Sequence, residues 1–198
     1  HDLIERNLLE GRAGKIAYID DAGQYTFGEV ADRVKRAATA MLGLGLRMEE
    51  RVMVCLLDTI DFPVAFLGCV HAGIVPIATN TLLTTDDYEY MLRDSRARAL
   101  VVSAALLPQF LPLIGRIPTL ETVVVSGGAP DGMLDLATLV ASAAPHVEPA
   151  ATKADDVCFW GYSSGSTGAP KGTLHVHSSL IQTVELYARP ILGLREDD

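Results

Sequence analysis

Short apolar runs alternate with helix-like segments along most of this 198-residue chain, and this alternation narrows the possible folds more than any other feature. Most of the runs lack polar interruptions, as strands do when both of their faces are covered. The repeated strand–helix order predicts an α/β fold, with a mostly parallel sheet flanked by helices on both faces. Pro76 lies within one run, which places that strand at an edge of the sheet or the proline at the strand's start. The predicted strands are residues 51–57, 74–78, 99–102, 122–125, 157–162 and 173–176.

Turn and capping residues divide the rest of the chain. Two short strands around a turn at residues 21–23 predict a β-hairpin. Thr26 and Glu29 then have the spacing of a capping box, and the helix that they open is expected to end at Gly43 or Gly45. Further helices are expected from Asp58 or Thr59 to residue 72, from Thr84 or Thr85 to residue 92, over residues 104–114 and 134–143, and from Ser178 or Ser179 to residue 187.

Composition excludes several classes of protein. Hydrophobic residues make up 49% of the chain and charged residues 21%, which is typical of a globular protein with a sizeable core. The formal net charge is −9, from 25 acidic and 16 basic residues, and no cluster of lysine and arginine stands out. A nucleic-acid partner is therefore not expected. No apolar run is long enough to span a bilayer, so no membrane span is expected either.

The three cysteines, Cys55, Cys69 and Cys158, each lie inside an apolar run and show no C-x-x-C spacing. This pattern favours buried, reduced, structural thiols, which fit the cytoplasm. Cys69 and His71 stand two residues apart on a predicted helix, so their side chains face different ways and do not form a zinc site. The sequence therefore leaves any metal ligands unknown.

The segment from Tyr162 to Gly172 reads Tyr-Ser-Ser-Gly-Ser-Thr-Gly-Ala-Pro-Lys-Gly and follows a predicted buried strand. Hydroxyl groups can surround an anion together with backbone N–H groups, which the glycines leave accessible. The lysine adds positive charge. The pattern is not a Walker A loop, because Lys171 is followed by glycine and the segment joins strand to strand. The alternative is an ordinary glycine- and serine-rich surface loop with a solvated lysine. The specific order of residues favours a phosphate site.

That order, with His177 six residues beyond Lys171, resembles the phosphate-binding loop of the adenylate-forming enzymes. This superfamily includes acyl- and aryl-CoA ligases, adenylation domains of peptide synthetases, and luciferase. Residues 58–68, 72–76, 80–84 and 86–92 are similar to segments of the benzoate-CoA ligases. Thr81 follows Asn80 where many members of the superfamily have proline.

The resemblance implies an ATP-dependent ligase that converts an aromatic carboxylate to an acyl-adenylate and transfers the acyl group to coenzyme A. It implies ATP, Mg²⁺ and coenzyme A as cofactor and co-substrates. His177 either assists at the phosphates, caps the following helix or fills a polar niche, whereas His175 on the strand before it is expected to be structural. The implied phosphate ligands are Ser163, Ser164, Ser166 and Thr167, with Gly165 and Gly168 allowing close approach and Lys171 as the catalytic cation.

The resemblance also implies that residues 1–198 are the N-terminal part of the large AMP-binding domain, with the rest of that domain and a small C-terminal domain lying downstream. A chain limited to these residues is then expected to be inactive, and a homodimer is one possible assembly of the intact protein. Two alternatives stay open: another acyl-CoA ligase or peptide-synthetase adenylation domain, and a non-catalytic nucleotide-binding module.

Overall fold

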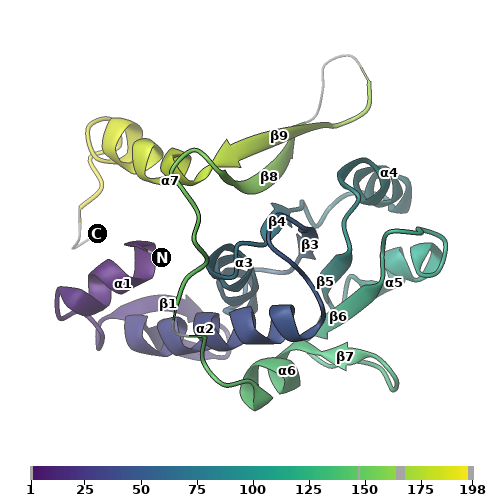
Figure 1. Ribbon diagram of the computed structural model, residues 1–198, viewed down its shortest axis with the longest axis horizontal. Helices are drawn as coiled ribbons and strands as arrows, with labels where there is room; N and C mark the ends of the chain where they lie inside the picture. Colours follow the sequence, from purple (N-terminus) through teal and green to yellow (C-terminus); the bar gives the residue numbers. More distant parts are fainter. Residues whose placement is uncertain (1, 147, 164–167, 196–198) are drawn as a thin grey trace.

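The computed structural model describes residues 2–146, 148–163 and 168–195, which form a seven-stranded sheet and a separate two-stranded sheet (Figure 1). The seven strands lie in the order β7-β6-β5-β3-β4-β8-β9. Every neighbouring pair is parallel except β8 and β9, which are antiparallel. The predicted α/β class with a mostly parallel sheet is therefore confirmed. The strands are β1 Ile16–Asp20, β2 Gly23–Thr26, β3 Arg51–Cys55, β4 Val75–Ala78, β5 Ala99–Ser103, β6 Thr122–Ser126, β7 Leu134–Asp135, β8 Val157–Ser163 and β9 Lys171–Val176.

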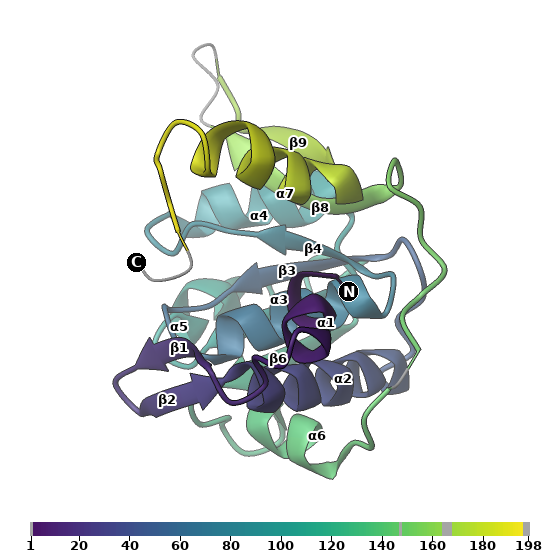
Figure 2. The same ribbon diagram turned by 90° about the vertical axis from the view of Figure 1, so that its left-hand side faces the viewer.

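Helices cover both faces of the large sheet, because successive side chains of each central strand point to opposite sides. Val52 and Val54 of β3 face a core shared with α2, α3 and α6, whereas Met53 and Cys55 face a core shared with α4, α5 and η1. In Figure 2 the strands run across the picture, with α1 and α2 nearer the viewer and the fainter α4 and α5 farther away. The helices are α1 Asp2–Leu9, α2 Phe27–Gly43, α3 Asp61–His71, α4 Thr85–Ser95, α5 Leu107–Phe110, the 3₁₀ helix η1 Leu111–Leu113, α6 Leu136–Ser142, α7 His177–Thr183 and the π-helix η2 Val184–Ala188.

Two helix starts match the capping signals in the sequence. Thr26 caps α2 in a capping box with Glu29, and α2 ends at Gly43 as expected. Thr84, not Thr85, caps α4, and Asp87 completes a second capping box. Each box satisfies two backbone N–H groups that a helix leaves without intrahelical partners.

Other helix predictions were wrong in their boundaries. Neither Asp58 nor Thr59 caps α3, whose N-cap residue is Ile60 and has no side-chain cap. The helix predicted over residues 104–114 is reduced to one α-helical turn and a 3₁₀ turn, because Pro108 and Pro112 each lack a donor N–H. The helix predicted from residue 134 begins at Leu136, because Asp135 is its N-cap.

The predicted edge position of Pro76 was also wrong, since β4 lies between β3 and β8. The N–H groups of Val75 and Thr79 donate to backbone carbonyl oxygens on the side of β3. Because backbone N–H groups along a strand point alternately to its two sides, the nitrogen of Pro76 faces β8. Pairing of β4 with β8 begins only at Ile77. The missing N–H therefore costs no ladder hydrogen bond, which fits the alternative that Pro76 stands near the strand's start.

The three cysteines are free and buried, as expected. Among the described residues, no three histidine, cysteine or carboxylate side chains are arranged to hold a metal ion, so Cys69 and His71 form no such site. No helix in the described part of the chain is long and apolar enough to cross a membrane.

Candidate phosphate-binding site

The candidate site stands at the tip of the hairpin formed by β8 and β9, which extends past the end of the central sheet (Figure 1). β8 ends at Ser163, β9 begins at Lys171, and the two residues are direct cross-strand partners. The loop thus joins strand to strand, as predicted. Gly168 has φ of +142°, a conformation that favours glycine. The remaining predicted ligands Ser164, Gly165, Ser166 and Thr167 lie outside the described residues.

Strand pairing decides which side chains share a face. Residues directly opposite one another on antiparallel strands point the same way. Ser163 and Lys171 therefore project from one face, next to the pair Gly161 and Thr173. Thr173 donates its hydroxyl to the Gly161 carbonyl oxygen at 2.8 Å, so this hydroxyl is already engaged. The exposed Ser163 and Lys171 remain the polar groups at the mouth of the loop.

The same face carries an aromatic series away from the loop. The rings of Phe159 and His175 stack with centroids 4.4 Å apart and planes at 3°. The ring of Phe66, from α3, contacts Phe159 edge-on at 5.5 Å. His175 is therefore a packing residue, as expected. These contacts fix the hairpin to α3 at the end that lies away from the loop.

His177 lies at that distant end as well. It stands six residue steps beyond Lys171 along an extended chain, a span of about 20 Å at 3.3 Å per residue. Its backbone N–H donates to the carbonyl oxygen of Asp156, and burial lowers the pKa of its imidazole. It is the first residue of α7, and Val176 is the N-cap residue. Ser178 and Ser179 therefore do not cap this helix, and the side chain of His177 lines a niche at the end of the strand away from Lys171.

That niche is a cavity of about 490 Å³ between α1, α2, α3, α7 and the connector before β8. Its apolar wall comes from α2, α3 and α7, and its polar groups include His71, His177 and the ion pair of Lys35 with Glu5 at 2.6 Å. Nε2 of His71 lies 3.0 Å from the carbonyl oxygen of His146, and burial lowers the pKa of the His71 ring. The cavity does not include Ser163 or Lys171 and is therefore separate from the hairpin tip.

Comparisons with known proteins agree with this geometry. The AMP-binding enzyme family matches residues 5–198. The chain is 62% identical over 198 residues to the benzoate–CoA ligase of Thauera aromatica. The aligned region covers 100% of this chain and 37% of that protein. It is 46% identical over 197 residues to the 4-hydroxybenzoate–CoA/benzoate–CoA ligase of Rhodopseudomonas palustris, with 100% and 36% covered. The chain thus spans little more than a third of the length of these relatives.

Solved structures of CoA ligases also resemble this chain in fold. The anthranilate CoA ligase AuaEII in complex with anthranoyl-AMP superposes with a TM-score of 0.94 at 38% identity, over 98% of this chain and 38% of that one. A benzoate CoA ligase from Burkholderia xenovorans LB400 superposes with a TM-score of 0.87 at 44% identity, over 98% of this chain and 37% of that one.

Proposed function

Because this chain belongs to the AMP-binding enzyme family, we propose that it supplies the phosphate-binding part of an ATP-dependent aryl-CoA ligase for an aromatic carboxylate of the benzoate type. We assign residues 1–198 to the N-terminal part of the large AMP-binding domain. The observation that carries the proposal is the Ser163–Lys171 pair, which sets a hydroxyl and a cation side by side at the base of the loop. The similarity to two benzoate–CoA ligases supports the class of acid.

The reaction proceeds in two steps. A carboxylate oxygen attacks the α-phosphorus of ATP, the bond to the bridging oxygen breaks, and pyrophosphate leaves as the acyl-adenylate forms. The thiolate of coenzyme A then attacks the acyl carbon, and AMP leaves. The first step needs positioning and neutralisation of phosphate charge more than a protein nucleophile.

In this scheme the chain's own residues bind the β- and γ-phosphates. Lys171 offsets the negative charge that grows on the departing pyrophosphate. Gly165 and Gly168 let the backbone approach the phosphates. The hydroxyl donors are Ser163, Ser164, Ser166 and Thr167.

The other proposed partners follow from the same reaction. We propose that Mg²⁺ accompanies ATP as its phosphate complex, and we assign no step to a metal bound by this chain. Coenzyme A and the aromatic acid complete the substrates, and any self-association would give a homodimer. The buried free cysteines fit a cytoplasmic enzyme.

The test uses a full-length ligase in which this chain supplies the matching segment, for example the Thauera aromatica enzyme with its aligned region replaced. Benzoate-dependent exchange of pyrophosphate into ATP, and AMP release that depends on coenzyme A, are the expected results. A panel of benzoate, hydroxybenzoates, 2-aminobenzoate and a fatty acid then defines the acid. Activity with the fatty acid alone, or none with any acid in a folded protein, would overturn the proposal. The 198-residue chain by itself is expected to show no exchange.

A further inference from the structure

We propose that Asp94 and Tyr162 form a positioning pair that holds the base of the phosphate-binding hairpin against α4. This inference rests on the proposed function, because it concerns how the same loop is placed. Tyr162 is the residue before Ser163 and stands opposite Gly172, the residue after Lys171. The pair therefore acts one residue away from the predicted phosphate ligands on both strands.

The contact itself is short and specific. The hydroxyl of Tyr162 donates to a carboxylate oxygen of Asp94 at 2.7 Å and also lies 3.4 Å from the carbonyl oxygen of Met91. Burial, followed by the bond to Asp94, raises the pKa of the phenol, so the hydroxyl stays protonated and can donate at neutral pH. A hydrogen bond to an ionised acceptor is stronger than one between neutral groups.

Few other contacts hold this end of the hairpin. Among the described residues β9 is an edge strand that pairs with β8 alone. The pairs of β8 with β4 there are Trp160 with Ile77 and Gly161 with Ala78. The described pairing with β4 ends at Gly161, and the hairpin of β8 and β9 extends past β4 in Figure 1. The side chain of Tyr162 connects the hairpin to α4 at the position where the backbone pairing of β8 with β4 ends.

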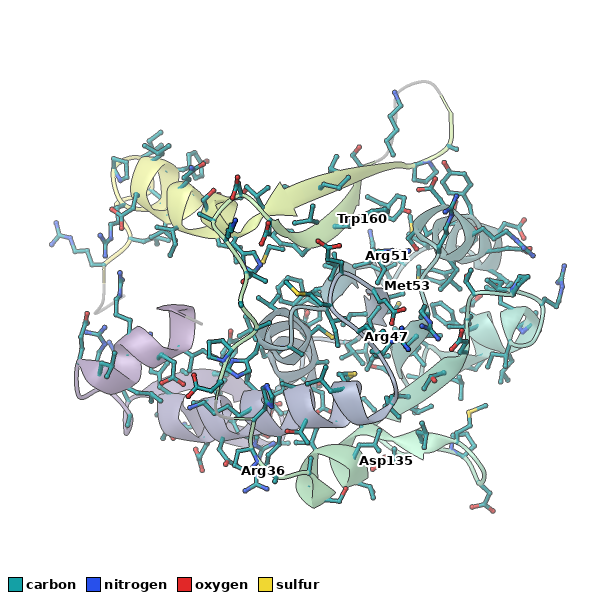
Figure 3. The ribbon with its side chains drawn as sticks, viewed as in Figure 1. Arg36, Arg47, Arg51, Met53, Asp135 and Trp160 are labelled. Atoms are coloured by element: carbon teal, nitrogen blue, oxygen red, sulfur yellow. The ribbon has the colours of Figure 1, made fainter. Side chains whose placement is uncertain are left out.

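The helix that carries Asp94, α4, is itself held in place by capping and by packing against the core. α4 begins with the Thr84–Asp87 capping box, and its Tyr88 ring stacks on Phe110 at 4.4 Å. Trp160 lies between the hairpin and the core beneath α4, as Figure 3 shows. A Cβ on Gly172 would lie 3.5 Å from the Trp160 ring and 3.6 Å from the Tyr162 ring, so both rings pack across this glycine. The two strands are thus held from the face opposite Ser163 and Lys171.

Loss of the hydrogen bond should let the hairpin tip move relative to the rest of the ligase. This movement would misalign the contacts of the tip with the polyphosphate and would leave the binding of the aromatic ring of the acid unchanged. Tyr162→Phe removes the hydroxyl and keeps the ring that covers Gly172. Tyr187→Phe is the matched control, because Tyr187 lies on η2, which follows the end of the hairpin away from the loop, is 50% exposed and has no hydroxyl partner among the described residues.

The experiment measures steady-state kinetics of the full-length ligase that contains this chain. Tyr162→Phe is expected to lower kcat/KM for ATP by about threefold to tenfold, the effect of one hydrogen bond, while KM for benzoate stays constant. Asp94→Ala should produce a similar loss, and Asp94→Asn, which keeps an acceptor oxygen, should recover part of it. The Tyr162→Phe/Asp94→Ala double variant should lose no more than either single variant.

A second readout does not require activity. Amide hydrogen exchange in peptides spanning residues 160–163 and 171–174 should speed up in Tyr162→Phe and stay unchanged in Tyr187→Phe. Unchanged exchange in Tyr162→Phe, or additive kinetic losses in the double variant, would overturn the positioning pair. If the wild-type ligase activates no acid, the proposed function fails, and the exchange measurement still decides whether the pair holds the hairpin.

Discussion

The carboxylate of Asp20, at the end of β1, accepts a hydrogen bond of 2.9 Å from the backbone N–H of Ile60, the N-cap residue of α3. The same carboxylate accepts bonds from the N–H groups of Ala22 and Gly23 in the hairpin turn. One side chain therefore closes the small sheet and satisfies the start of a helix that has no side-chain cap of its own. The bond connects the two-stranded sheet to the helical layer on the large one.

Replacing Asp20 with alanine should destabilise the chain in a pH-dependent way. The bond from Ile60, followed by those from the turn, lowers the pKa of Asp20 below its ordinary 3.8. The folded state thus binds this proton more weakly than the unfolded state, so the stabilisation is complete above about pH 5 and is lost as pH falls through 3.8 and below. Urea unfolding should show a lower midpoint for Asp20→Ala at pH 7, and a smaller difference from wild type at pH 3. The exposed neighbour Asp21 provides the control variant Asp21→Ala, and a difference that grows at pH 3 would contradict the assignment.

Local signals in the sequence were sufficient for some elements and not for others. The Thr26–Glu29 capping box lies within four residues, so its geometry follows from spacing alone. The acceptor for the N–H of Ile60, at the start of α3, is Asp20, 40 residues earlier, and no spacing rule reveals it. The strands were recognisable as apolar runs, but their order in the sheet was not. Pro76 is consistent with either an edge strand or a strand start, and only the return of β8 from far along the chain to cover that side rules out the edge.

Gly68 of α3 is expected to tolerate no side chain. A Cβ there would lie 2.6 Å from Cβ of Ala37 on α2, so Gly68→Ala must separate the two helices. Such overpacking costs about 1–3 kcal/mol of unfolding free energy. Gly43→Ala, at the end of α2, meets no atom within 4 Å and should instead be neutral or stabilise by up to about 1 kcal/mol. Denaturant unfolding of both variants gives the comparison, and equal effects would show that the interface adapts.

His71 should make stability fall on mild acidification. Burial lowers the pKa of its ring below the ordinary 6.5, with Lys35 and His146 nearby. Protons therefore bind more tightly in the unfolded state, so stability is present above pH 6.5 and declines as pH falls through the lower pKa of the folded state. His71→Gln keeps an N–H that can donate to the His146 carbonyl and removes the titration. Its unfolding free energy should decline less than that of wild type between pH 7 and pH 5, and parallel declines would rule His71 out as the cause.

In the candidate site, too, contacts between residues close in sequence were predictable, whereas contacts between residues far apart in sequence were not. The adjacency of Ser163 and Lys171 follows from a strand–loop–strand reading, because the two residues flank one short connection. His177 is close to the loop in sequence but stands at the other end of β9, since an extended strand carries it away. Asp94 was missed altogether, because it meets Tyr162 across 68 residues and looks in sequence like any exposed helical carboxylate.

Lys171→Ala in the full-length ligase should slow adenylation more than it weakens binding of the aromatic acid. The lysine stands at the base of the loop beside Ser163 and acts on phosphate charge, not on the carboxylate substrate. Loss of one charge-assisted contact to phosphate costs about 1.5–3 kcal/mol, or roughly tenfold to a hundredfold in rate. Single-turnover formation of the acyl-adenylate measures this step directly, and equilibrium binding of benzoate measures the other quantity.

Lys153→Ala is the matched control for that measurement. Lys153 is another exposed lysine, and it precedes β8 at the end of the strand that lies away from the loop. Its removal changes the net charge by the same amount, so a general electrostatic effect of losing one cation would slow both variants alike. A slow step confined to Lys171→Ala ties the lysine to the phosphates at the hairpin tip. An adenylation rate equal to wild type in Lys171→Ala would instead make it a solvated loop residue, and the hydroxyl and backbone donors of the loop would have to bind the polyphosphate without it.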